Sequence, residues 1–100
     1  MVTVAGLVEA LLERDGEIGG RDDAAMDLGH YDDDLALDAL FTVAADPSEE
    51  EFIQDVCGES IAQILSKRNL FDRELIVKLN PTAKSSALSV LKYLKPEWFQ

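Results

Sequence analysis

The residues of this chain best suited to chemistry are carboxylates, and they gather in one segment. The set, with one neighbouring tyrosine, is Asp23, Asp27, Tyr31, Asp32, Asp33, Asp34 and Asp38. Such a cluster can coordinate a hard cation or attract a cationic protein. An EF-hand loop requires glycine at its sixth position and glutamate at its twelfth. Counted from Asp32, these positions hold Leu37 and Val43, so the motif fails. We predict a partner-binding acidic ridge here, with another cation site or a solvated capping loop as alternatives.

A second group of carboxylates has regular spacing. Asp22 and Asp55 recur at an offset of 33 residues, and Glu59 follows Asp55 by four, which places both on one helix face. Paired carboxylates perform acid–base catalysis when their surroundings separate their pKa values. No nucleophile or base–orienter pair accompanies them, so we predict no catalytic residues. We expect Asp22 and Asp55 to accept hydrogen bonds from backbone donors at helix starts or between repeats, with direct binding as the alternative.

The only histidine and the only cysteine lack the partners that chemistry requires. A zinc site needs several nitrogen or sulfur ligands, and His30 has none nearby, so no metal or cofactor is predicted. Cys57 cannot form an internal disulfide, and its acidic segment disfavours a reactive thiolate. It is interpreted as a packing residue.

Charge divides the chain into two unequal parts. The sequence holds 20 acidic and 9 basic residues, a net charge of −11. Through Leu65 there are 17 acids and 2 bases, a net of −15, and the remainder carries +4. The acidic part would repel nucleic acid and anionic membranes, and it would attract a basic protein. The simpler interpretation is that the charge serves only solubility.

Apolar residues recur at helical spacings of three and four, and strand-like alternation is nearly absent. The pattern predicts an all-α chain with six helices, of which the fourth carries the longest apolar stripe. Their apolar stripes fall in residues 4–11, 24–28, 36–43, 52–65, 75–79 and 83–94. Start signals are Thr3, Asp46-Pro47, Asp72 and Asn80-Pro81.

An internal repeat underlies these helices. Residues 22–29 align with 55–62, matching small residues with small ones and Leu28 with Ile61. The segments RDDAAMDLG (21–29), ALDALFTVAADP (36–47) and DVCGESIAQI (55–64) resemble bacterial HEAT-like, PBS-lyase-type repeat proteins. The resemblance implies a short α-α superhelix of antiparallel helix pairs with one exposed binding ridge. Members of that family scaffold proteins, inhibit enzymes or, in one branch, act as pigment lyases.

The expected organisation is one all-helical domain over residues 1–100. Residues 21–65 form the HEAT-like region, and residues 70–100, which depart from its pattern, form a C-terminal capping helical hairpin. Trp98 and Phe99 are expected to fold back onto that hairpin.

The function predicted from charge and fold is protein binding rather than catalysis. The chain would engage a basic partner through the acidic ridge, in the manner of an immunity-type inhibitor. The alternative is a regulatory or scaffold subunit of an enzyme complex, such as a lyase-type HEAT-repeat component. No nucleic acid or membrane partner is expected, and the chain is expected to be a monomer or weak dimer. The lack of an apolar span or a signal peptide predicts a cytoplasmic location.

Overall fold

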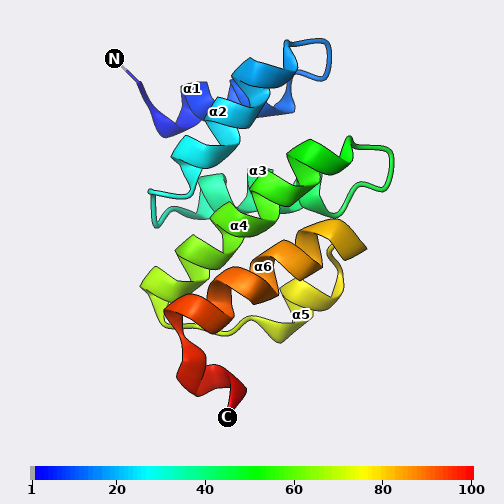
Figure 1. Cartoon of the computed structure of the whole chain (residues 1–100). Helices are drawn as coiled ribbons and strands as arrows, with labels where there is room; N and C mark the ends of the chain where they lie inside the picture. The colour runs from blue at the N-terminus through cyan, green and yellow to red at the C-terminus, as the bar shows by residue number, and fades with distance from the viewer. Residues whose placement is uncertain (1) are drawn as a thin grey trace.

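The computed structural model describes residues 2–100, and they form an all-helical fold (Figure 1). The helices are α1 (Val4–Leu12), α2 (Ile18–Leu28), α3 (Asp34–Ala44), α4 (Glu51–Arg68), α5 (Arg73–Val77) and α6 (Pro81–Leu94), followed by the 3-10 turn η1 (Pro96–Phe99). The predicted all-α class and the six helices are confirmed.

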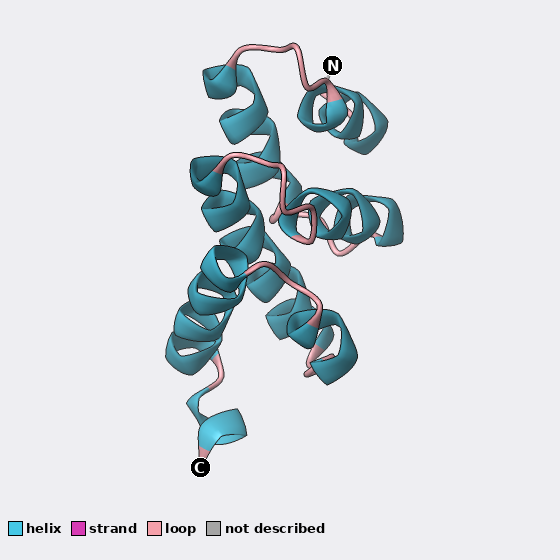
Figure 2. Ribbon diagram, turned by 90° about the vertical axis from the view of Figure 1, so that its right-hand side faces the viewer, coloured by secondary structure: helices cyan, strands magenta, loops and turns pink. Residues whose placement is uncertain are grey.

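The helices lie in two layers (Figure 2). α1, α3 and α5 stack along one side, and α2, α4 and α6 stack along the other. α4 is the central helix, packing against α2, α3 and α6. The molecule measures 41 × 29 × 19 Å, and its two termini lie at opposite ends of the stack (Figure 1).

The predicted apolar stripes form most of the core. Leu11, Leu28, Leu40, Ile61 and Leu91 are all fully buried. α4 is buried on several sides because it has neighbours in both layers, and even Gln54 and Ser60 are buried there.

Two predicted core positions are wrong. Phe52 is 53% exposed because it lies in the first turn of α4, on the same side of that helix as the exposed Glu59. Leu94 is 41% exposed at the last position of α6, where the helix ends.

Most helix boundaries follow the local signals. Thr3 Oγ1 accepts from the amide of Gly6 at 3.0 Å, and Asp72 Oδ1 accepts from that of Leu75 at 3.1 Å. Asn69 ends α4 in the left-handed conformation, with φ of 54°, which asparagine tolerates. Asn80-Pro81 opens α6 as predicted.

The start predicted at Asp46-Pro47 is wrong, because α4 begins at Glu51. Asp46 Oδ1 instead accepts from the amide and the hydroxyl of Ser48, at 2.9 and 2.8 Å, and closes a local turn. Asp22, which was expected at a helix start or between repeats, lies inside a helix, because α2 already begins at Ile18.

Small residues let the helices of the second layer approach closely. A Cβ atom on Gly58 would lie 2.3 Å from the carbonyl oxygen of Ala83 in α6. Ser60 Oγ of α4 donates to the carbonyl oxygen of Ala25 in α2 at 2.6 Å. Residues 25 and 58, which are matched in the sequence repeat, therefore each contact the next helix of the same layer.

Candidate functional site

The aspartates of the α2–α3 loop are largely engaged by the fold. Arg68, near the end of α4, binds Asp32 through Nε and Asp34 through Nη2, the latter at 2.6 Å. The hydrogen bonds that Arg68 donates to these two carboxylates raise the pKa of its guanidinium. Asp33 Oδ1 caps α3 by accepting from the amides of Leu35 and Ala36. The central part of the predicted ridge is therefore partly neutralised by a cation that lies more than thirty residues away in the sequence.

Asp38 lies apart from the rest of the predicted ridge. It lines a shallow hollow with residues of α3 and α5, which belong to the first layer. The other lining residues are Phe41, Asp72, Glu74, Leu75 and Lys78. The structure therefore does not bring Asp38 together with the aspartates of α2.

The remaining predicted carboxylates, Asp23 and Asp27, lie on the exposed side of α2. α4 packs against α2 and contributes Asp55 and Glu59, and the charge of Asp22 in α2 acts on Glu59. We define the α2–α4 acidic face as Asp22, Asp23, Asp27, Asp55 and Glu59. None of the five forms a salt bridge within residues 2–100, where the ion-paired arginines bind other carboxylates.

Two carboxylates of this face are electrostatically strained. Asp22 Oδ1 is buried and has no hydrogen-bond partner. Burial, and then the charge of Asp23, raise the pKa of Asp22. Burial, and then the charges of Asp55 and Asp22, raise the pKa of Glu59. These carboxylates repel one another across two helices, and an added positive charge would relieve that repulsion.

The prediction that Asp22 and Asp55 accept hydrogen bonds from backbone donors is wrong. Asp55 accepts from the hydroxyl of Ser86 in α6, not from a backbone donor at a helix start. Asp22 lies inside α2, where the backbone amides already donate to carbonyl oxygens of the same helix. No donor is therefore left for Asp22 Oδ1, which has no hydrogen-bond partner.

Apolar side chains accompany the acidic face. Met26 is 52% exposed on α2, and Phe52 is 53% exposed on α4. A hollow adjoins Glu59 between α2, α4 and α6, lined also by Met26, His30, Val56, Ser60, Gln63 and Val90. Exposed apolar groups surrounded by charge are the composition of a protein-binding surface.

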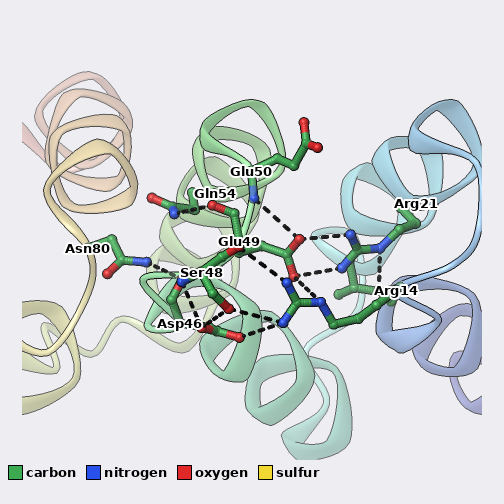
Figure 3. Close-up of polar contacts among 9 residues, drawn as sticks. Arg14, Arg21, Asp46, Ser48, Glu49, Glu50, Gln54 and Asn80 are labelled. Carbon is green, nitrogen blue, oxygen red and sulfur yellow. Dashed lines mark hydrogen bonds and ion pairs between the residues drawn. The ribbon is translucent and has the colours of Figure 1, made fainter.

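A buried ion pair joins the first two helix pairs (Figure 3). Arg21 of α2 donates from Nη1 and Nη2 to the two carboxylate oxygens of Glu49, each at 2.8 Å. Its Nε donates to the carbonyl oxygen of Leu11 at 2.9 Å. The hydrogen bonds between the pair lower the pKa of Glu49 and raise that of Arg21, so both are charged.

The surrounding polar groups extend this connection along the stack. Arg14 binds Asp46 Oδ2 at 3.0 Å, and Asn80 Nδ2 donates to the carbonyl oxygen of Asp46 at 2.7 Å (Figure 3). Gln54 Nε2 donates to the carbonyl oxygen of Glu49. Because these groups are bonded to one another across all three helix pairs, we assign the network a structural role.

Within residues 2–100, the structure shows neither an accessible thiol nor a cluster of metal ligands. Cys57 is buried, and burial raises the pKa of its thiol to about 12, so the thiol stays protonated. Within residues 2–100, no group of three His, Cys, Asp or Glu side chains is placed to hold a metal ion. Over the same residues, no helix has the length and apolar character needed to cross a membrane.

No protein-family model, curated protein or solved structure matches this chain. The resemblance to HEAT-like repeats therefore stays a prediction from the residues that carry it.

Proposed function

We propose that this chain is a non-enzymatic protein-binding module that engages a basic partner through the α2–α4 acidic face. The observation that carries the proposal is the convergence of Asp22, Asp55 and Glu59 on two adjacent helices without a compensating cation. A surface that only served solubility would spread its charges apart, since crowded carboxylates destabilise the fold. Crowded carboxylates beside exposed apolar groups instead suit a cationic protein surface.

We propose that the all-helical fold that presents this face is a short HEAT-like α-α superhelix. The three pairs α1–α2, α3–α4 and α5–α6 are proposed as its successive units, with the last as the C-terminal cap. Two observations support this. α2 and α4 begin 33 residues apart, at Ile18 and Glu51. The matched positions Ala25 and Gly58 each contact the next helix of the second layer.

The proposed site differs in part from the ridge predicted from the sequence. Asp23 and Asp27 remain in it, and Tyr31, 38% exposed, follows them where α2 ends. Asp32 and Asp34 contribute less because Arg68 already binds them. An inhibitor of the immunity type, which blocks a basic enzyme, is one form that such a module would take.

Differential capture from cell lysate tests the proposal. The immobilised wild-type chain is compared with an Asp23→Lys/Asp27→Lys variant and with an Asp38→Lys/Glu74→Lys control. The control makes the same change in charge on the α3–α5 hollow. We expect a protein of basic isoelectric point that the wild type and the control retain at low ionic strength. The α2 variant, and high ionic strength, should both release it.

Two results would count against the proposal. One is that no protein is retained at low ionic strength, and the other is that both double variants lose the captured protein equally. Capture of a catalytic subunit whose activity changes on binding would favour the alternative role as a regulatory subunit.

A further inference from the structure

Two exposed patches lie on the terminal elements of the stack, and their charges are opposite. α1 occupies one end of the molecule and η1 the other, as both views show (Figures 1 and 2). The long dimension of 41 Å separates these ends, so the two patches cannot meet within one chain.

The first patch lies on α1 and is acidic. An open hollow there is lined by Val8, Glu9, Leu12 and Glu13, which we call the α1 patch. Leu12 is 43% exposed, and the two glutamates are one helical turn apart on the same side. Neither glutamate forms a salt bridge within the described residues. The hollow therefore offers an apolar floor beside two free carboxylates.

The second patch is aromatic and basic. The ring of Phe71 lies 5.6 Å from that of Trp98 and 5.9 Å from that of Phe99, measured between centroids. Lys92 Nζ lies 5.7 Å from the centroid of Phe99, and Lys95 Nζ lies 5.7 Å from that of Trp98. We call these five residues the η1 patch.

The η1 patch is open to a partner. Phe71 and Phe99 are 38% and 37% exposed, and neither lysine has a carboxylate partner in the described part of the chain. Within the described residues, the ammonium group of Lys95 donates only to the side-chain oxygen of Asn69. The patch therefore presents exposed rings with two ammonium groups beside them.

We propose that the chain associates head to tail, with the η1 patch of one copy docked on the α1 patch of a second copy. The rings would cover Val8 and Leu12, and Lys92 and Lys95 would face Glu9 and Glu13. Charge selects this pairing, because two α1 patches or two η1 patches brought together would repel. The stack also leaves each terminal helix pair with a neighbour on one side only, so a second copy can approach either end.

This interface has a distinct assembly behaviour. A head-to-tail contact joins different surfaces, so every added copy leaves one free patch at each end. Assembly therefore continues beyond a dimer as concentration rises, unless the rotation between copies closes a ring. The proposal does not rest on the α2–α4 acidic face.

Sedimentation velocity of the purified full chain at low and high ionic strength tests the head-to-tail association. The Debye length falls from about 30 Å at 0.01 M salt to about 3 Å at 1 M, so high salt screens the attraction between the two patches. At low ionic strength, we expect the average mass to rise above the monomer mass of 11.0 kDa with concentration. At high ionic strength, it should return to that value. The variants Glu9→Lys/Glu13→Lys and Lys92→Glu/Lys95→Glu should each remain monomeric, because both of their ends then carry like charge.

Mixing the two variants distinguishes lost association from lost folding. Each variant supplies the end that complements the other, so an equimolar mixture should associate again. A wild-type chain that stays monomeric at low ionic strength would overturn the proposal, as would a mixture that stays monomeric. Association that survives Glu9→Lys/Glu13→Lys but is lost in Asp23→Lys/Asp27→Lys would also overturn it, because the η1 patch would then dock on the α2–α4 acidic face.

Discussion

Removal of the buried carboxylate at Glu49 should destabilise the fold more than any surface change. The side chains of Arg21 and Glu49 are 4% and 3% exposed, and the guanidinium binds both carboxylate oxygens. Glu49→Ala leaves a buried positive charge without its partner, a loss of about 3–5 kcal/mol. A domain of this size is stable by about 5–15 kcal/mol in total, so the variant should unfold at much lower urea concentration.

The Arg68–Asp34 pair provides a matched control. The Asp34 side chain is 88% exposed, and solvent screening limits such a pair to about 0–1 kcal/mol. Urea unfolding followed by far-ultraviolet circular dichroism gives both values. If Glu49→Ala costs no more than Asp34→Ala, the assignment of Arg21 and Glu49 as the structural link between helix pairs is refuted.

The same pair has a defined pH dependence. The folded pKa of Glu49 lies below its ordinary value of 4.5. Its contribution is therefore complete above the unfolded pKa and is lost as the pH falls through the folded pKa. The double variant Arg21→Met/Glu49→Leu removes both charges, so its stability should decline less than that of the wild type below about pH 4.5.

Three further predictions test the packing and the site. Gly58→Ala should destabilise the fold by about 1–3 kcal/mol because the added Cβ meets the Ala83 carbonyl. Gly20→Ala, whose Cβ would have nothing within 4 Å, should stabilise α2 by up to about 1 kcal/mol. Equal effects of the two variants in urea unfolding would contradict the close approach at Gly58. Glu59→Gln should raise the melting temperature at neutral pH. The pKa of Glu59 is raised in the folded chain, so stability falls as the pH rises from its unfolded pKa through its folded pKa. An unchanged or lower melting temperature would argue against repulsion at this face. The Cys57 thiol should react with a thiol reagent only after unfolding, because it is buried and its pKa is about 12; rapid labelling of the native chain would show that α4 is misplaced.

The sequence predicted the helices well because their signals are local. The apolar stripe containing Ile61 and Leu65, the cap at Asp72 and the start at Asn80-Pro81 all depend on neighbours within a few positions. The error at Asp46-Pro47 has the same origin. An aspartate before a proline suits a helix cap, but it can equally close a turn, and here Ser48 supplies the donors for the turn.

The candidate site was harder to predict because it depends on contacts between distant residues. Arg68 lies 36 residues from Asp32, and Arg21 lies 28 residues from Glu49, so spacing alone did not indicate either pairing. The repeat offset did single out Asp22 and Asp55. Their crowding with Glu59 became visible only once α2 and α4 were placed side by side.

The most direct test of the central claim is the rate at which the captured basic partner associates with the wild type and with Asp23→Lys/Asp27→Lys. Surface plasmon resonance across a range of ionic strengths measures this rate. If the α2–α4 acidic face is the binding surface, association of the wild type should slow steeply as salt is added. The variant should associate about tenfold or more slowly at low salt, with a weaker salt dependence. Equal association rates and equal salt dependence for the two chains would contradict the claim.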